Sequence, residues 1–290
     1  MLSQLKKLIL ISFFFSHPVA AIQLPEEQME EWNRLIYFYD EGFKIDNDQF
    51  LLSRPKASPL KELEATINLF LEAKEICRFP ARYEFLLRTG LIEEISKTCP
   101  ELDEYRKKAP AFNFAYVLAD ESLNSITGMM GHGFLVSAGQ TSQGLLTKHS
   151  YTFFTEIDDR NPISLIRNAF LTGMVGHFAL RPYDQHFQEY NAIERRNIWE
   201  ADLDLSRNAI TRLHDVLWEL RDVHPDYLFQ DFNCATLTLY SLATIEPDLL
   251  KKEPSFVTPV DVYRALQREQ LIVKSTLFPP PNSSPRSLPT

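Results

Sequence analysis

Several motifs that mark metal, nucleotide and serine-hydrolase sites are missing from the sequence. There is no His-Glu-x-x-His pattern and no close cluster of cysteines and histidines, so a zinc site has no support. The stretch Asp46-Asn47-Asp48 lacks the glycine and the distant glutamate of a calcium-binding loop. Neither a glycine-rich phosphate loop nor a Gly-x-Ser-x-Gly elbow occurs. We therefore expect no metal ion and no cofactor.

Excess positive charge is also absent, because the chain carries a formal net charge of -9 at pH 7. Sequence-independent binding of nucleic acid needs a basic face, and docking onto anionic lipid needs clustered lysine and arginine. Both classes of partner are excluded on this ground. Beyond residue 21 no stretch is apolar enough to cross a bilayer. The processed protein should therefore have no integral membrane span.

The first 21 residues have the composition of a secretory signal peptide. Lys6 and Lys7 precede the apolar run 8–16, which is too short to span a bilayer. Small residues follow, and Val19 and Ala21 fit the cleavage rule. We expect a cut after Ala21 and a periplasmic or secreted protein. The alternative is an uncleaved membrane anchor.

Cysteines are few, and their number is odd. In an oxidising compartment two of the three would normally pair and leave one over. Cys77 and Cys99 flank one predicted helical hairpin, so we expect a bridge between them that contributes roughly 3 kcal/mol in the chain-entropy model. Cys234 is then left unpaired. An unpaired thiol outside the cytoplasm is prone to oxidation, so its presence calls for burial, a partner or a chemical role.

Residues 22–108 are predicted to form a small helical subdomain stapled by that disulfide. Helices are expected after Pro25, from Pro59 with Ser58 as the N-cap, over 80–88 and over 92–97.

From about residue 109 the pattern becomes typical of an α+β domain with an antiparallel sheet. Strands are predicted at 112–118, 133–138, 151–157, 173–180 and 198–203. Helices should follow Ser206, start at Cys234 and start at Pro259. The domain is expected to end at residue 275. Residues 276–290, rich in proline and serine, are expected to form a disordered tail.

The pair Asn233-Cys234 stands where a predicted strand meets a helix. Asn233 is a good N-cap, which puts Cys234 in the first turn of the helix. There the helix dipole and the backbone N–H groups favour a thiolate and could also hold an oxyanion. We therefore expect a thiol pKa below the free value of about 8.5. The alternative is a buried and inert cysteine, the commonest fate of a lone one.

A nucleophilic thiol needs a base, and histidine is the usual one. His132 lies between two glycines at the start of a predicted strand, where the missing side chains would let a ligand or another backbone approach. A hydrogen-bonded turn histidine is the alternative. A third polar group should orient the base, and His177 and His149 are the candidates.

From residue 131 onward a series of motifs follows in a fixed order: Gly131-His132-Gly133-Phe134-Leu135, Pro182-Tyr183, Tyr190, Arg195-Arg196-Asn197-Ile198-Trp199-Glu200 and Asn233-Cys234-Ala235-Thr236. This order resembles the bacterial Lnb N-terminal periplasmic domain family. The family pattern comprises Gly-His-x-Phe-Leu, Arg-Asp-hydrophobic-Trp-Glu and Asn-Cys followed by a small residue. Asn197 replaces the usual aspartate. The stretch 77–83 resembles the helical region that precedes this domain in longer relatives, and Cys99 matches its second cysteine.

The histidine-first, cysteine-later order looks like that of circularly permuted papain-like proteins, including the lecithin-retinol-acyltransferase-like group and the NlpC-like hydrolases. The resemblance implies a permuted papain-like fold and thiol attack on an ester or amide, by hydrolysis or acyl transfer. Cys234 would be the nucleophile, His132 the base and Asn233 an oxyanion or positioning group. The substrate would be an envelope peptide, glycan or lipid. The rival interpretation is a catalytically inactive envelope protein that binds a ligand in the same cleft.

Overall fold

The computed structural model describes residues 24–121, 131–156, 161–252, 254 and 256–281. The expected signal peptide and its cleavage site after Ala21 lie outside these residues. Within the described part of the chain, no helix is both long and apolar enough to cross a membrane.

The described residues contain nine α-helices and nine strands. The helices are α1 (Glu26–Leu35), α2 (Pro59–Asn68), α3 (Pro80–Arg88), α4 (Pro100–Lys108), α5 (Pro162–Arg167), α6 (Tyr183–Phe187), α7 (Arg207–Glu219), α8 (Cys234–Ala243) and α9 (Pro259–Arg268). The strands are β1 (Phe38–Tyr39), β2 (Gly42–Phe43), β3 (Asn113–Ala119), β4 (His132–Gln140), β5 (Leu146–Thr155), β6 (Met174–Pro182), β7 (Ile198–Leu203), β8 (Asp226–Tyr227) and β9 (Ile272–Phe278). Short π-helical or 3₁₀ segments extend this set: η1 (Leu69–Ala73), η2 (Asn168–Thr172), η3 (Gln188–Ile193) and η4 (Pro247–Leu250).

The N-terminal region is helical and carries the expected disulfide, Cys77–Cys99. The predicted helix over 92–97 is wrong, because these residues form no regular structure and the next helix, α4, begins at Pro100. The hydroxyl group of Tyr83 accepts the backbone N–H of Ile95 and also contacts its carbonyl oxygen, at 2.8 and 3.4 Å. A side chain thus satisfies backbone groups that a helix would otherwise have paired. The bridge therefore joins the two segments on either side of α3 and this irregular stretch.

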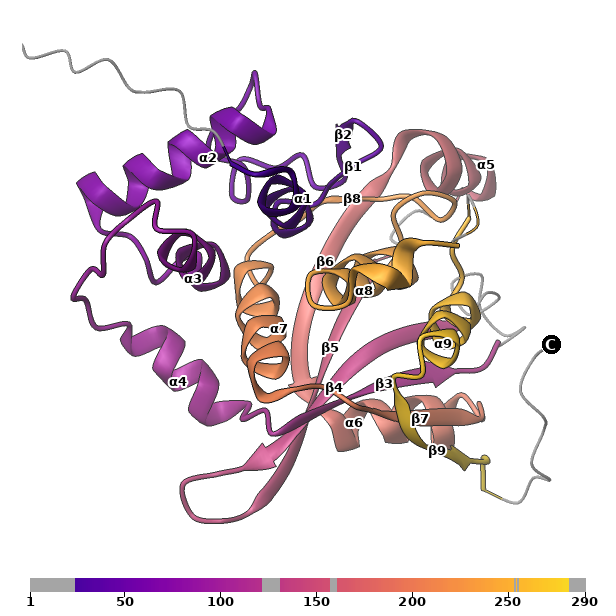
Figure 1. Ribbon diagram of the computed structural model, residues 1–290. Coiled ribbons are helices and arrows are strands. Elements are labelled where there is room, and N and C mark those ends of the chain that lie inside the picture. The colour runs from indigo at the N-terminus through magenta and orange to yellow at the C-terminus, as the bar shows by residue number, and fades with distance from the viewer. Residues whose placement is uncertain (1–23, 122–130, 157–160, 253, 255, 282–290) are drawn as a thin grey trace, which may run out of the picture.

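The helical region shares a core with the rest of the chain. Apolar residues of α1 and α3 pack in one buried cluster with residues of α7, β8 and α8, including Val216 and Leu237. The hydroxyl group of Tyr37 is 2.7 Å from that of Ser241 near the end of α8. In Figure 1 the first three helices gather beside α7, away from the strands β7 and β9. The helical region therefore supports α7 and α8, two of the helices that pack on the sheet.

The seven-stranded sheet has the order β8-β6-β5-β4-β3-β7-β9, and all neighbouring strands are antiparallel. The predicted α+β class with an antiparallel sheet is confirmed. The last strand was not expected: residues 276–278, assigned to a disordered tail, belong to β9 and pair with β7. Residues 282–290 lie outside the described part. Figure 1 shows α7, α8 and α9 on one face of the sheet and α6 on the other.

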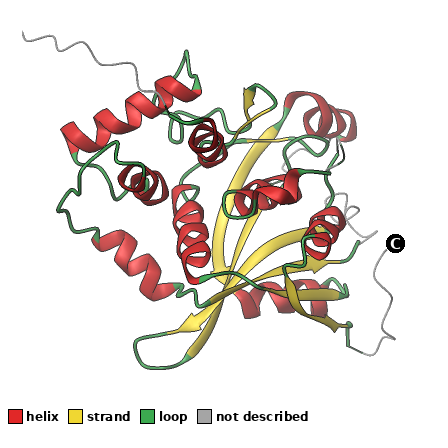
Figure 2. Cartoon of the chain, viewed as in Figure 1, coloured by secondary structure: helices red, strands yellow, loops and turns green. Residues whose placement is uncertain are grey.

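The central strands β4 and β5 separate at one end. Their pairing runs from Gln140 opposite Leu146 to Leu135 opposite Tyr151. Beyond that point, residues 132–134 pair with β3 and residues 152–155 pair with β6. We call the gap between these two stretches the strand fork. Figure 2 shows β5 and β6 curving away from β3 and β4 there. The fork is the opening in the sheet that places the candidate site.

Candidate functional site

The helix α8 begins as the sequence predicts, with a side-chain cap. The Asn233 side-chain oxygen accepts the backbone N–H groups of Ala235 and Thr236, at 2.8 and 3.1 Å. Its amide nitrogen donates to the carbonyl oxygens of Phe229 and Val257. Both ends of this buried amide are therefore occupied within the protein. Of its two expected roles, the geometry supports positioning of the helix start, since the amide N–H groups are already committed.

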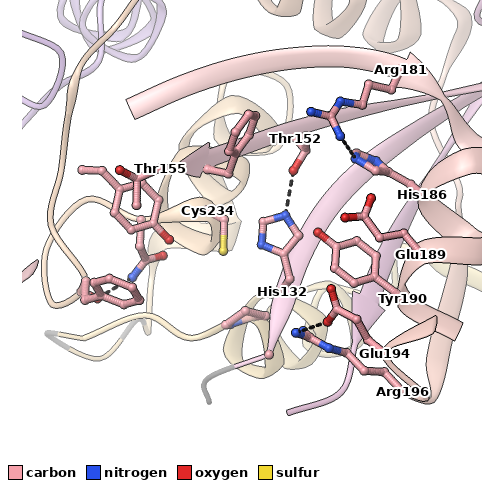
Figure 3. A pocket seen from close by; sticks show the side chains of 16 residues that line it. His132, Thr152, Thr155, Arg181, His186, Glu189, Tyr190, Glu194, Arg196 and Cys234 are labelled. Atoms are coloured by element: carbon pink, nitrogen blue, oxygen red, sulfur yellow. Dashed lines mark hydrogen bonds and ion pairs between the residues drawn. The ribbon is translucent and has the colours of Figure 1, made fainter. Parts of the chain in front are cut away.

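Cys234 is the first residue of α8, and its unpaired side chain is only 5% exposed. It lines a cavity of about 260 Å³ together with His132. The two side chains come from opposite faces of the sheet. Cys234 belongs to α8, whereas the His132 ring lies with Phe134 and Tyr190, 5.7 Å from each ring, on the side of α6. The strand fork is the opening through which they meet, as Figure 3 shows.

The glycines around His132 each serve a different purpose. Gly131 has φ +74°, a conformation that other residues adopt only with strain. At Gly133 a Cβ atom would stand 2.1 Å from the Tyr116 hydroxyl oxygen and 3.2 Å from Pro259. One glycine therefore permits the turn before the strand, and the other permits the close approach of α9 and of Tyr116.

His132 has a hydroxyl partner that the sequence did not indicate. Its Nε2 is 2.6 Å from the Thr152 hydroxyl oxygen, across the fork on β5. In the tautomer that carries its proton on Nε2, this nitrogen donates to Thr152 and Nδ1 is left as an acceptor. In Figure 3 this second ring nitrogen faces the Cys234 sulfur. Thr152 thus holds the orienting position that a third catalytic group would take.

The two histidines expected as candidates for that position lie elsewhere. His177 on β6 packs against Phe154 and His224, with ring centroids 5.8 and 5.2 Å away, and it is not among the residues that line the cavity. His149 is buried on β5 opposite Ser137 and also does not line the cavity.

A different histidine, His186 of α6, does line the cavity. Its Nδ1 is 2.7 Å from the Ser150 hydroxyl oxygen, and its Nε2 is 3.5 Å from the Arg181 guanidinium. Burial and Arg181 lower the pKa of His186 to about 4. Burial, with His186 and Arg196 nearby, likewise lowers the pKa of His132 to about 3. Both imidazoles are therefore neutral near pH 7.

The expected lowering of the thiol pKa is wrong, because burial raises the pKa of Cys234. Polar groups beside the sulfur oppose this effect. They are the backbone N–H of Gly133, the Tyr227 hydroxyl group and the N–H groups of Ala235 and of Cys234 itself. Gly133 lies where β4 has lost β5 as a neighbour, so its N–H is available to the sulfur. Near neutral pH the site is a neutral thiol beside a neutral imidazole.

The remaining motif residues divide into two groups. The hydroxyl group of Tyr183 donates to Glu200 at 3.0 Å, and this hydrogen bond joins α6 to β7. Lys148 forms an ion pair with the same carboxylate. Tyr190 and Arg196 line the cavity instead, with the guanidinium 5.2 Å above the tyrosine ring.

Asn197, which departs from the family pattern, donates to Asp120 at 2.7 Å. An aspartate at position 197 would bring a second carboxylate to Asp120. The substitution is therefore compatible with its surroundings in this chain.

The residues that sequence reasoning missed are Thr152, His186, Arg181 and Tyr227, all in the cavity wall. The register of β5 and β6 places Thr152 and Arg181, and the helix α6, which follows β6, places His186; no local sequence pattern carries that register. In the part of the chain that the structure describes, no group of three or more histidine, cysteine, aspartate or glutamate side chains could hold a metal ion.

The fold and the site define an α+β protein with a cysteine and a histidine in one cavity at a fork in its sheet. Residues 101–269, more than half of the chain, match the family described as the Lnb N-terminal periplasmic domain. The chain belongs to this family. Residues 25–89 match a second family, described as a domain of unknown function (DUF7843). No curated protein and no solved structure matches the chain. Membership of a periplasmic domain family fits an envelope protein that is periplasmic or secreted.

Proposed function

We propose that the protein is an exported, cysteine-dependent hydrolase or acyltransferase that acts on an amide or ester in the cell envelope. The observation that carries this proposal is the meeting of an unpaired thiol at a helix start and a neutral imidazole in one cavity. The order of His132 before Cys234 is that of the permuted papain-like enzymes that the family resembles. The cystine bridge elsewhere in the chain fits an oxidising compartment.

The positions of the side chains support the following reaction. His132 Nδ1 takes the proton of the thiol while the Cys234 sulfur forms a bond to the substrate carbonyl carbon. The carbonyl electron pair moves to its oxygen. When the pair returns, the bond to the alcohol or amine breaks, and His132 gives its proton to that leaving group. Water then releases the acid from the thioester, or an acceptor amine or alcohol takes the acyl group.

The electrostatics favour proton transfer during the attack over a preformed ion pair. The low pKa of His132 and the raised pKa of Cys234 keep both groups neutral before substrate arrives. Thr152 holds the imidazole by its Nε2. The N–H groups of Gly133 and of Cys234, which already point at the sulfur, are placed to hold charge that develops beside it.

The substrate class that fits this location is a peptide, glycan or lipid of the envelope with an acyl bond. The cavity is lined by charged as well as aromatic side chains: Arg181, Arg196, Glu189 and Glu194 stand with Tyr190, Phe154 and Phe229. A polar substrate group beside the scissile bond would therefore meet partners of either charge.

The test uses the processed protein with p-nitrophenyl acetate as the acyl donor. Wild-type protein should gain one acetyl group, mapped to Cys234 by mass spectrometry of peptides. Cys234→Ala, which removes the sulfur, should gain none at this position. His132→Ala should slow acetylation by about 10²- to 10⁴-fold, the usual contribution of a general base. Thr152→Val keeps the shape but removes the hydroxyl group, and should cause a smaller loss. Added glycine methyl ester as an acceptor distinguishes acyl transfer from hydrolysis.

One control measures reactivity without acyl chemistry. Because burial raises the thiol pKa, labelling of Cys234 by iodoacetamide should keep accelerating with pH beyond about 8.5, the value of a free thiol. If the folded protein is neither acetylated nor alkylated at Cys234 and labels only after unfolding, the cysteine is structural. The function would then be ligand binding in the same cavity.

A further inference from the structure

Tyr227 is held rigidly in the wall of the cavity. It is the second residue of β8 and lies opposite Met174 of β6. Its ring packs against Phe153 and Phe229, with centroids 5.1 and 5.3 Å away, and the residue is 6% exposed. Both Tyr227 and Cys234 line the cavity. Packing on both sides fixes the direction of the hydroxyl group.

The hydroxyl group of Tyr227 lies beside Cys234, where it interacts with the sulfur and with the backbone N–H of that residue. The Asn233 cap takes the next two N–H groups of α8, those of Ala235 and Thr236. The N–H of Cys234 is not used by this cap, and it faces both the sulfur and the tyrosine hydroxyl group. A phenol O–H and a backbone N–H thus meet beside the atom that would attack a carbonyl carbon.

We propose that Tyr227 is a further catalytic residue, whose hydroxyl group donates a hydrogen bond to the carbonyl oxygen of the substrate in the tetrahedral intermediate. This inference rests on the function proposed above. As the sulfur shares an electron pair with the carbonyl carbon, it loses its value as an acceptor. The carbonyl oxygen gains that pair as negative charge, and the O–H turns from sulfur to oxygen. No proton leaves the tyrosine and no other reactant is needed.

The surroundings of Tyr227 keep it a donor throughout. Burial raises its pKa well above the ordinary value, so the phenol stays protonated and neutral. A donor held in place and aimed at the position where charge develops is the arrangement by which enzymes stabilise an oxyanion. Tyr116, which also lies near Cys234, is committed elsewhere, because its hydroxyl group donates to the Pro259 carbonyl oxygen at 2.8 Å.

The test compares two reactions of the same sulfur atom. Acetylation by p-nitrophenyl acetate passes through an oxyanion, whereas alkylation by iodoacetamide does not. Tyr227→Phe keeps the packed ring and removes only the hydroxyl group. We expect acetylation of Cys234 to fall about 10²- to 10³-fold, the cost of one lost oxyanion donor. The alkylation rate at high pH, where the thiolate is fully formed, should change only a few-fold. The midpoint of the alkylation profile should move to higher pH, because the thiolate loses a hydrogen bond.

Tyr116→Phe is the matched control, since it removes a neighbouring phenol that makes no bond to the sulfur. It should leave the ratio of acetylation to alkylation unchanged. If Tyr227→Phe lowers both rates equally, or lowers neither, Tyr227 is not an oxyanion donor. If wild-type Cys234 is alkylated but never acetylated, the proposed function itself fails. Thermal unfolding of each variant, followed by circular dichroism, shows whether the fold is kept.

Discussion

A buried carboxyl group where the helical region meets α7 gives a quantitative prediction. Glu219, near the end of α7, accepts the backbone N–H groups of Ala81 and Arg82 in the first turn of α3, at 2.8 and 3.1 Å. The Arg82 guanidinium is 3.4 Å from its second oxygen and 2.9 Å from Glu62. One buried cation therefore faces two carboxyl groups. Burial raises the pKa of Glu219 to about 7, despite Arg82 and the two N–H groups.

The perturbation is Glu219→Gln, which keeps an acceptor for the two N–H groups and removes the titration. Between the ordinary pKa of 4.5 and about 7, folded Glu219 retains a proton that the unfolded chain has released. The stability that the group contributes is therefore fully present below pH 4.5 and is lost as the pH rises through 7. From pH 5 to pH 8 these two pKa values give a loss of about 2.5 kcal/mol in wild type relative to the variant.

The assay is urea unfolding of both proteins at pH 5, 6, 7 and 8. The free energy of unfolding of the variant differs from that of wild type by a constant amount, because a neutral amide replaces the carboxyl group beside Arg82. That constant difference does not depend on pH. All other titrating groups are common to both proteins and cancel in the difference. Glu84→Gln makes the same chemical change at an exposed position of α3, and only the slope in excess of this control is assigned to Glu219. A difference that stays constant, or that favours wild type as the pH rises, would refute the reasoning.

Three further predictions concern the rest of the chain. Replacing both Cys77 and Cys99 by serine should lower the free energy of unfolding by about 3 kcal/mol in urea titrations, because the bridge closes a loop across a separation of 22 residues; an unchanged midpoint would contradict this. Gly133→Ala should cost about 1–3 kcal/mol through the clash with the Tyr116 hydroxyl oxygen, and Tyr116→Phe in the same chain should recover part of that loss; additive effects in the double-mutant cycle would argue against the clash. Protein recovered from the envelope should begin at Ile22 by intact mass, and a chain that retains the first 21 residues would disprove the cleavage.

The sequence predicted those parts of the fold that local chemistry determines. Serine or asparagine before the helix marked the starts of α2, α7 and α8, and each of these caps makes its hydrogen bond. The strand 198–203 has the predicted bounds. The bridge partners followed from their positions around α3. In each case the signal lies within a few residues of the feature it specifies.

Features that depend on distant partners could not be predicted in this way. The irregular stretch 92–97 has helical periodicity, but Tyr83 takes its backbone groups. The strand β9 is an edge strand with exposed side chains, so its sequence lacks the apolar alternation of a covered strand. Thr152 becomes the partner of His132 only because β4 and β5 stand in one register and then separate. The thiol pKa also depends on distant partners. Burial by several elements raises it, and this effect outweighs the lowering expected from the helix start.

The strand fork explains why these distant features converge at one place. Where β5 leaves β4, Gly133 loses a strand neighbour and its N–H becomes available to the Cys234 sulfur. The same separation lets the His132 ring and the start of α8, which belong to opposite faces of the sheet, meet in one cavity. The absence of a side chain at Gly133 is then a requirement of this geometry, because a Cβ atom there would collide with the Tyr116 hydroxyl group behind the strand. The pattern of a histidine between two glycines is ambiguous in the sequence. The end of the pairing between β4 and β5 explains why this pattern stands at the cavity.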